Sequence, residues 1–321
     1  MIVTVTANPS LDRTLELGAP LARGEVQRAG TVRTEPGGKG VNVARVVAAA
    51  GLSTRALLPA RTGDPLCTAL DELGLPYDAV PVDGEVRSNI TIAESDGTTT
   101  KINAPGVALT ARDRDALVEL IRAHADSAQW VTLCGSLPPG VTDNWYRAIA
   151  DDLVLAGCRV AVDTSGAPLR ATVAGRVDLI KPNEDELAEL TGADPATLRE
   201  ALSRNDLEPV VEAATAIAEQ IGGNVLATLG AAGAVLVTAS GVWSATPPPI
   251  VPRSTVGAGD SSLAGFLIAQ STGASPADCL RSAVAYGAAA ASLAGTQAPT
   301  PDHLDLPGVR VTELSGAARM S

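Results

Sequence analysis

The chain has 321 residues, of which 45% are hydrophobic and only 2% aromatic, and its 24 basic and 36 acidic residues give a net charge of −12. This length suits one large domain whose core is built from aliphatic side chains. The acidic balance and the scarcity of aromatic rings exclude nucleic acid and anionic membrane surfaces as partners. An anionic ligand would therefore need a local basic pocket.

The first residues, "MIVTVTANPSLD", predict a strand that reaches a turn, without the basic leader and apolar run of a signal peptide. No window approaches 18 uninterrupted apolar residues, so we expect no membrane-spanning segment. The four cysteines are far apart and form no C-x-x-C pair, which favours reduced thiols over disulfides or a zinc site. We therefore expect a cytoplasmic protein.

Two segments of the first hundred residues, about 13–34 and 86–103, have alternating or turn-punctuated patterns that are typical of small antiparallel strands. We expect them to form a lid or a dimer face over the open edge of the core. Plain edge hairpins are the alternative. Between the two segments, "GGKGVNVARVVAAAG" predicts a helix that begins after consecutive glycines and ends at Gly51.

The second half of the chain alternates short β-rich runs with helical patterns. The runs are "WVTLCG" before "NWYRAIADDLVLAG", "RVAVDTSG" before a short helix, "VDLIKPN" before "EDELAEL", and "NVLATLG" after a helix near 209–221. This rhythm predicts an α/β fold in which helices flank a central, mainly parallel sheet, with residues 1–321 forming a single domain. Ligands of such sheets bind outside the carboxyl ends of the strands, so the loops there should carry the chemistry.

Two glycine-rich loops, "EPGGKGVNVAR" and "STVGAGDSS", each precede a predicted helix. Neither matches the Walker A or the dinucleotide-binding pattern, which makes a Rossmann oxidoreductase a poor fit. The amides of residues 257–260 instead predict a nest for phosphate oxygens at a helix N-terminus. Asp260 would then either stabilise the helix dipole or accept a proton beside bound phosphate, and the residues alone leave both open.

The three lysines of the chain, against 21 arginines, all lie in loop-like contexts rich in glycine, proline or asparagine: Lys39, Lys101 and Lys181. Lysine supplies a compact point charge where arginine supplies a planar fork. After Lys181, Asn183 and Glu186 lie three residues apart on the first turn of a predicted helix. This spacing suits a hydrated Mg²⁺ beside phosphates and fits a helix capping box equally well.

Taken in order, "GGKGVNVAR", "KPNEDEL", "TLGAAGA" and "STVGAGD" resemble the phosphofructokinase B branch of the ribokinase-like sugar kinases over nearly the whole chain. The motifs "NPSLDRT", "GGKG", "SNITI" and "CGSLPPG" are most similar to the hexose-phosphate subgroup. The resemblance implies a ribokinase-like fold, with ATP and Mg²⁺ as cofactors and a sugar phosphate as substrate. We also expect a homodimer.

The resemblance also implies a role for each matching residue. Asp260 would be the general base that accepts the sugar hydroxyl proton, and Gly257, Ala258 and Gly259 would form the anion hole. Matching sugar-side positions are Asp12, Gly38, Lys39, Asn42, Arg87, Lys101 and Ser136; matching nucleotide positions are Lys181, Asn183, Thr228, Gly230 and Gly233, with Glu186 for the metal. Around Ala294 the chain reads "SLAGTQ", where some relatives have an asparagine near the adenine, so recognition of the base is not predicted.

We therefore expect the chain to phosphorylate D-fructose 1-phosphate to D-fructose 1,6-bisphosphate. Fructose 6-phosphate and tagatose 6-phosphate are the alternative substrates within the same class. A sugar-phosphate sensor that kept the fold without catalysis is an alternative of a different class. The presence of both Asp260 and Glu186 favours the enzyme.

Overall fold

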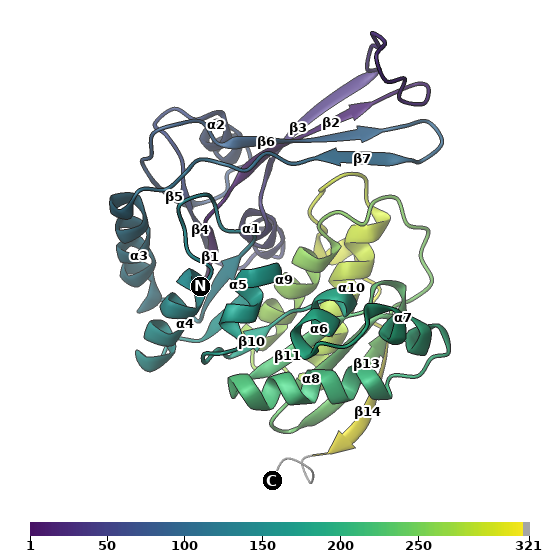
Figure 1. Ribbon diagram of the computed structural model, residues 1–321. Helices are drawn as coiled ribbons and strands as arrows, with labels where there is room; N and C mark the ends of the chain where they lie inside the picture. Colours follow the sequence, from purple (N-terminus) through teal and green to yellow (C-terminus); the bar gives the residue numbers. More distant parts are fainter. Residues whose placement is uncertain (317–321) are drawn as a thin grey trace.

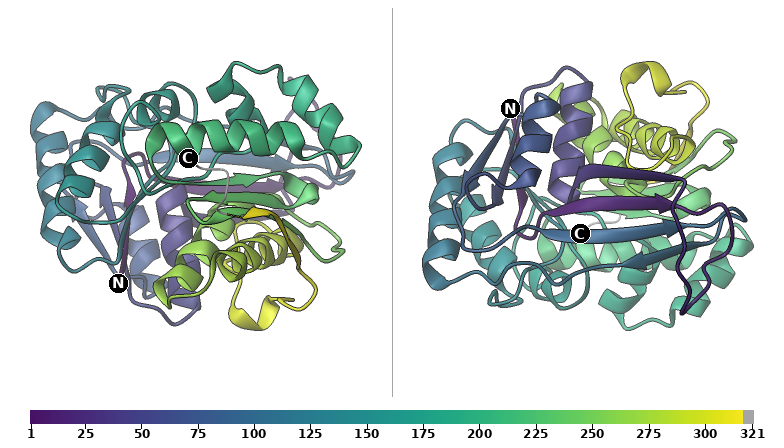
Figure 2. Two further views of the ribbon diagram at one scale, coloured as in Figure 1. Left: turned by 90° about the horizontal axis from the view of Figure 1, so that it is seen from below. Right: turned by 90° about the horizontal axis from the view of Figure 1, so that it is seen from above.

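The computed structural model describes residues 1–316, which form a large sheet, sheet A, and a small sheet, sheet B. Helices cover both faces of sheet A, and sheet B lies beyond the carboxyl ends of its parallel strands (Figures 1 and 2). Sheet A has the strand order β14-β13-β12-β11-β10-β9-β8-β1-β4-β5. All pairings from β5 to β11 are parallel and those from β11 to β14 are antiparallel, so the prediction of a mainly parallel sheet is confirmed.

The strands of sheet A are short and largely buried, as expected for a sheet covered on both faces. β1, β8 and β9 are buried at every residue. In chain order the strands are β1 (Ile2–Thr6), β4 (Thr54–Pro59), β5 (Tyr77–Val80), β8 (Trp130–Cys134), β9 (Val160–Asp163), β10 (Leu179–Ile180), β11 (Asn224–Thr228), β12 (Ala234–Thr238), β13 (Gly241–Thr246) and β14 (Arg310–Gly316).

Alternate side chains of each strand enter two different cores. Val3 and Val5 of β1 pack under the helices of one face, whereas Ile2 packs under those of the other. The first face carries α3 (Ala111–Ala125), α4 (Trp145–Leu155), α5 (Gly166–Thr172), α6 (Glu184–Thr191), α7 (Pro195–Ser203) and α8 (Glu208–Ile221). The second carries α1 (Lys39–Ala49), α2 (Pro65–Glu72), α9 (Ala258–Ser271) and α10 (Pro276–Ser292).

Sheet B consists of β3 (Thr31–Gly37), β2 (Ser10–Glu16), β6 (Arg87–Ala93) and β7 (Thr99–Ile102), in that order. The outer pairs are antiparallel, as predicted, but the central pair β2–β6 is parallel, so the prediction of purely antiparallel strands was wrong there. Both central strands start near the carboxyl edge of sheet A and run outward, which makes their directions the same. Residues 17–30 of the first predicted segment lie between strands.

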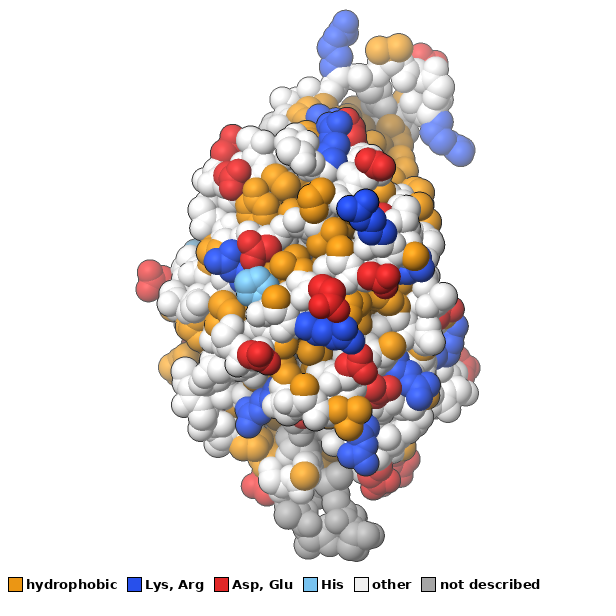
Figure 3. Space-filling model, turned by 90° about the vertical axis from the view of Figure 1, so that its left-hand side faces the viewer, with side chains coloured by type: hydrophobic (Ala, Val, Ile, Leu, Met, Phe, Trp, Pro, Cys, Tyr) orange, Lys and Arg blue, Asp and Glu red, His pale blue; other side chains and the backbone are white. Residues whose placement is uncertain are grey.

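The surface of one side of the molecule mixes basic and acidic side chains without a continuous basic patch (Figure 3). No helix within residues 1–316 has the length and apolar character needed to cross a membrane. The four cysteines are free thiols, two of them buried.

Candidate active site

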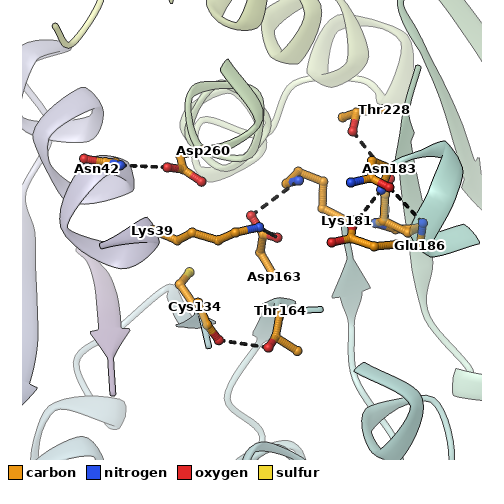
Figure 4. A network of polar contacts seen from close by, with 12 residues as sticks. Lys39, Asn42, Cys134, Asp163, Thr164, Lys181, Asn183, Glu186, Thr228 and Asp260 are labelled. Atoms are coloured by element: carbon orange, nitrogen blue, oxygen red, sulfur yellow. Dashed lines mark hydrogen bonds and ion pairs between the residues drawn. The ribbon is translucent and has the colours of Figure 1, made fainter. Parts of the chain in front are cut away.

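Several predicted site residues, among them Lys39, Lys181 and Asp260, meet where β8, β9 and β10 end and where α1 and α9 begin (Figure 4). Gly257 precedes α9 with φ +77°, a left-handed conformation that favours glycine. Asp260 lies in the first turn of α9 and is only 7% exposed. Parallel strands therefore present their loops to the start of a helix, as the βα pattern predicted.

A fully buried carboxylate, Asp163 at the end of β9, lies between two ammonium groups. Its Oδ1 is 2.7 Å from Nζ of Lys39, and its Oδ2 is 3.4 Å from Nζ of Lys181. Although burial by itself raises the pKa of Asp163, the charges of Lys181 and Lys39 hold that pKa below its usual range. Asp163 is therefore ionised at neutral pH, and the two lysines compensate its buried charge.

The pKa of Lys39 responds to the same charges. Burial by itself lowers that pKa, but the carboxylates of Asp163 and Asp260 outweigh burial and raise the pKa of Lys39 above its usual range. Lys39 therefore keeps its positive charge, although it lies in the mouth of the site with about a third of its side chain exposed.

Asp260 has the opposite electrostatic character to Asp163. Its pKa is raised, chiefly because of burial, and the nearby Asp163 charge adds to the rise while Lys39 opposes it. Its Oδ2 accepts a hydrogen bond of 2.8 Å from Nδ2 of Asn42 on α1. A carboxylate with a raised pKa is a stronger base, so Asp260 suits proton transfer better than Asp163 does.

The first turn of α9 lies beside a buried positive charge. The Ala258 amide donates to the carbonyl oxygen of Thr255 at 3.4 Å, whereas the Gly259 amide has no intrahelical acceptor and can face a ligand. A Cβ atom on Gly259 would lie 3.3 Å from Nζ of Lys181, which places that ammonium directly beside the turn. This cradle has the chemistry that phosphate oxygens need, and the phosphate nest expected at residues 257–260 stays a prediction.

Among the residues predicted to bind the sugar, Asp12 of β2 is oriented by its neighbours. Its Oδ1 accepts hydrogen bonds from Oγ of Ser10 at 2.8 Å and from Nδ2 of Asn89 at 3.0 Å. A Cβ atom at Gly37 would collide with the Asp12 carboxylate, which explains a glycine before Gly38. Within residues 1–316, the buried Oδ1 of Asn89 has no hydrogen-bond partner, as expected of a group that awaits a ligand hydroxyl.

Arg87 and Ser136 come together at Asn8, in the loop after β1. The Arg87 guanidinium donates to the carbonyl oxygens of Ala104 at 3.0 Å and Asn8 at 3.1 Å. The Asn8 amide donates to Oγ of Ser136 at 3.3 Å. Lys101, by contrast, is exposed on β7, and its predicted part in holding a sugar phosphate stays a prediction.

Among the residues predicted to bind the nucleotide, Asn183 and Glu186 form the capping box that their spacing allowed. Oδ1 of Asn183 accepts from the Glu186 amide at 2.8 Å, and Oε2 of Glu186 accepts from the Asn183 amide at 2.9 Å. The described residues contain no cluster of three or more histidine, cysteine or acidic side chains that could hold a metal. A hydrated Mg²⁺ that binds mainly to phosphates needs only one protein carboxylate, so Glu186 still fits that ion.

Three further predicted nucleotide positions surround the turn after β11. The Thr228 amide donates to the carbonyl of Pro182 at 2.9 Å, which joins this turn to Asn183. Gly230 and Gly233 both have positive φ values, and a Cβ atom at Gly233 would collide with the backbone of β13. The structure therefore brings these residues together beside the start of α6.

Sequence reasoning missed two residues of this site, Asp163 and Asn89. Asp163 ends a fully buried strand in "RVAVDTSG", and a carboxylate at the carboxyl end of a parallel strand is a recognisable signal of a ligand-facing group. Asn89 lies within the predicted segment 86–103, but its contact with Asp12 depends on the parallel pairing of β2 with β6.

The cradle at the start of α9 and the nearby carboxylate with a raised pKa are compatible with phosphoryl transfer on an α/β fold. Residues 6–303 match the model of the pfkB family carbohydrate kinases, and the chain belongs to that family. It is therefore a phosphotransferase with an alcohol group as acceptor. The predicted ribokinase-like fold is confirmed by solved structures.

Named relatives include enzymes that act on two different sugar phosphates. The 1-phosphofructokinase of Haloferax volcanii is 37% identical over 93% of each chain. The ATP-dependent 6-phosphofructokinase isozyme 2 of Mycobacterium tuberculosis is 33% identical over 95% of this chain and 88% of its own. Phosphofructokinase-2 of Escherichia coli, solved in complex with substrates and products, superposes with a TM-score of 0.84 at 32% identity over 94% of this chain and 96% of its own.

Proposed function

We propose that the chain transfers the γ-phosphoryl group of ATP to D-fructose 1-phosphate and so forms D-fructose 1,6-bisphosphate. The observation that carries the kinase chemistry is the buried Asp260, hydrogen-bonded to Asn42 beside the amide cradle of α9. The similarity to a 1-phosphofructokinase supports the choice of sugar. A non-catalytic sensor would not require a buried carboxylate with a raised pKa at this place.

The residues divide between the two substrates. Asp12, with Asn89, would hold sugar hydroxyls, while Lys39 and Arg87, with Ser136 and Lys101, would hold the sugar phosphate. The turn of Gly257, Ala258 and Gly259, with Lys181, would hold the transferred phosphoryl group. Asn183, Thr228, Gly230 and Gly233 would line the nucleotide side. Mg²⁺, held by Glu186 and the phosphates, would neutralise charge on the nucleotide.

Asp260 would accept the proton of the sugar hydroxyl. At the same time the hydroxyl oxygen would form a bond to the γ-phosphorus, and the bond between that phosphorus and the leaving ADP would break. The Asn42 amide keeps one oxygen of Asp260 engaged at 2.8 Å and so leaves the other oxygen for the hydroxyl. Backbone amides and the Lys181 ammonium compensate the charge that spreads over the transferred group.

We further propose a cytoplasmic homodimer. Sheet B supports the dimer because its exposed side chains include the large apolar residues Val32 and Ile102, at 56% and 55% exposure. The unpaired thiols support the compartment. A particle mass near the 32.4 kDa of one chain in sedimentation experiments would contradict the dimer.

A panel of sugar phosphates tests the activity directly. ADP release is measured with fructose 1-phosphate, fructose 6-phosphate and tagatose 6-phosphate, with Asp260→Asn as the control for background hydrolysis. We expect fructose 1-phosphate to be preferred by at least about tenfold in kcat/KM, equivalent to about 1.4 kcal/mol of transition-state binding. A preference for fructose 6-phosphate would overturn the choice of sugar and leave the kinase chemistry intact. No ADP release with any sugar would favour the sensor.

A further inference from the structure

Asp163 has no part in the proposed reaction so far, although it is the most deeply buried charge of the site. It is the last residue of β9, and both neighbouring strands fix its place, with Cys134 of β8 directly opposite it and β10 paired one residue earlier. A carboxylate held this firmly at a functional edge of a parallel sheet calls for an explanation.

The two oxygens of Asp163 face two different lysines. Oδ1 pairs with Lys39, at the start of α1, and Oδ2 lies near Lys181, after β10. Figure 4 shows these lysines approaching Asp163 from opposite sides, with Asp260 lying close to the group. Lys181 also lies beside Gly259 in the phosphate cradle, whereas Lys39 lies one helical turn from Asn42 on the sugar side.

We propose, on the basis of the kinase function proposed above, that Asp163 is a positioning residue that holds the Lys39 ammonium for the sugar substrate and the Lys181 ammonium for the transferred phosphoryl group. A lysine side chain has four flexible bonds, so an ammonium acts in a transition state at little entropic cost only if another group holds it in place. A single carboxylate between both lysines would link the sugar half of the site to the nucleotide half.

The charge of Asp163 also acts on Asp260. The charged and polar groups around Asp260 are Lys39 and Asn42 from α1, Asp163 from β9 and Lys181 after β10. Asp163 raises the pKa of Asp260, and the two lysines lower it. If Asp163 were neutral, both lysines would act on Asp260 unopposed, its pKa would fall, and it would be a weaker base.

A purely structural role makes a different prediction. If Asp163 only neutralises the charges of Lys39 and Lys181, its replacement lowers the stability of the fold but leaves both KM values near those of wild type. The KM values therefore separate the two roles.

The test compares wild type with Asp163→Asn by measuring kcat, both KM values and the acidic limb of kcat/KM against pH. We expect kcat/KM at neutral pH to fall about 10²-fold, with both KM values raised, because both lysines lose their anchor. The acidic limb should move to lower pH, because Asp260 ionises more readily. Asp163→Glu keeps the charge, so its acidic limb should stay near that of wild type while its rate falls.

Asp178→Asn is the matched control. Oδ2 of Asp178 accepts a 2.7 Å hydrogen bond from the Val160 amide, at the opposite end of β9 from Asp163. The same substitution there should leave the acidic limb unchanged. If Asp163→Asn does not fold, Asp163→Glu takes its place in the KM measurements, because a displaced carboxylate should still raise both KM values.

A readout that needs no turnover completes the test. Carboxyl ¹³C NMR follows the titration of Asp260 in the free protein, with the signal assigned from its loss in Asp260→Asn. We expect Asp260 to titrate at lower pH in Asp163→Asn than in wild type. Unchanged Asp260 titration, with only stability lost, would overturn the proposal. If wild type phosphorylates none of the sugars, the proposed function fails, and the NMR titration still decides whether Asp163 acts on Asp260.

Discussion

The carboxyl edge of sheet A and sheet B both contribute to the site, but they differ in burial. At the edge of sheet A, Asp163 is fully buried and Asp260 nearly so, and strands pair on both sides of β9. In sheet B, Val32 and Ile102 are more than half exposed, and β3 and β7 are edge strands. Phosphoryl transfer needs fixed charges in a dry place, which only a packed sheet edge provides. Substrate entry needs a part that can move, and a thin sheet with little core suits that task.

The largest effect should come from the buried edge. Asp260→Asn keeps the shape and a hydrogen-bond acceptor but removes the base, so turnover should fall by about 10² to 10⁴. The pKa of Asp260 is raised in the folded state, so its ionised form opposes folding at pH values above the unfolded pKa. The neutral variant should therefore unfold at an equal or higher urea concentration at neutral pH, and this advantage should vanish at low pH.

Turnover per folded molecule and urea unfolding of Asp260→Asn are measured together. A variant that unfolds readily but retains near-normal turnover would show that the carboxylate only stabilises the start of α9. The contrast between a chemical edge and an exposed sheet would then lose its main support.

Two glycines allow the packing of the sheet A edge and of sheet B to be compared at the backbone. Gly233 and Gly97 both have positive φ, +98° and +91°, so alanine is strained at either position. A Cβ atom at Gly233 would also collide with the β13 backbone, whereas at Gly97, in the turn of sheet B, nothing lies within 4 Å. We expect Gly97→Ala to cost about 1 kcal/mol of unfolding free energy, and Gly233→Ala about 1–3 kcal/mol more. Equal losses in urea unfolding would show that the two regions are equally tolerant.

The smallest expected effect is a change in the hydrogen exchange of sheet B. Amide hydrogen exchange of segments 13–34 and 86–103 should slow at saturating fructose 1-phosphate, because a closing lid shields its backbone and excludes water. β8 and β9 should be protected with and without the ligand. Unphosphorylated fructose serves as the control. If segments 13–34 and 86–103 exchange equally fast with and without the sugar phosphate, sheet B is not a closing lid.

The mainly parallel core could be predicted because it depends on local patterns, and the same patterns placed several of the predicted site residues on neighbouring loops. Each apolar run with its following helix identifies a βα unit, and the glycine loops mark their own positions before α1 and α9. The directions in sheet B could not be predicted in this way. β2 and β6 are separated by some seventy residues, and nothing within either strand specifies its partner.

The site illustrates a second kind of limit. The Asn183–Glu186 spacing fits both a capping box and a metal site, and the structure forms the box without excluding the ion. The place of Asp163 in the site could not be predicted, because its neighbours have the pattern of an ordinary buried strand. The two lysines that it contacts lie 124 and 18 residues away in the sequence. A sequence shows which charges exist, but the fold decides which of them meet.

The register of sheet B has a mechanical consequence. Ser10 is paired with both Gly37 and Arg87, so the points at which β2, β3 and β6 join the body of the protein lie in one row. From that row the seven residues of β2 extend about 20 Å, so a rotation of about 10° around it would carry the far end through about 4 Å. If sheet B rotates when substrate binds, this row would be the axis of rotation. A dye attached at the exposed Asp96, in the turn between β6 and β7, would lie far from that axis and could serve as an optical sensor of sugar-phosphate concentration.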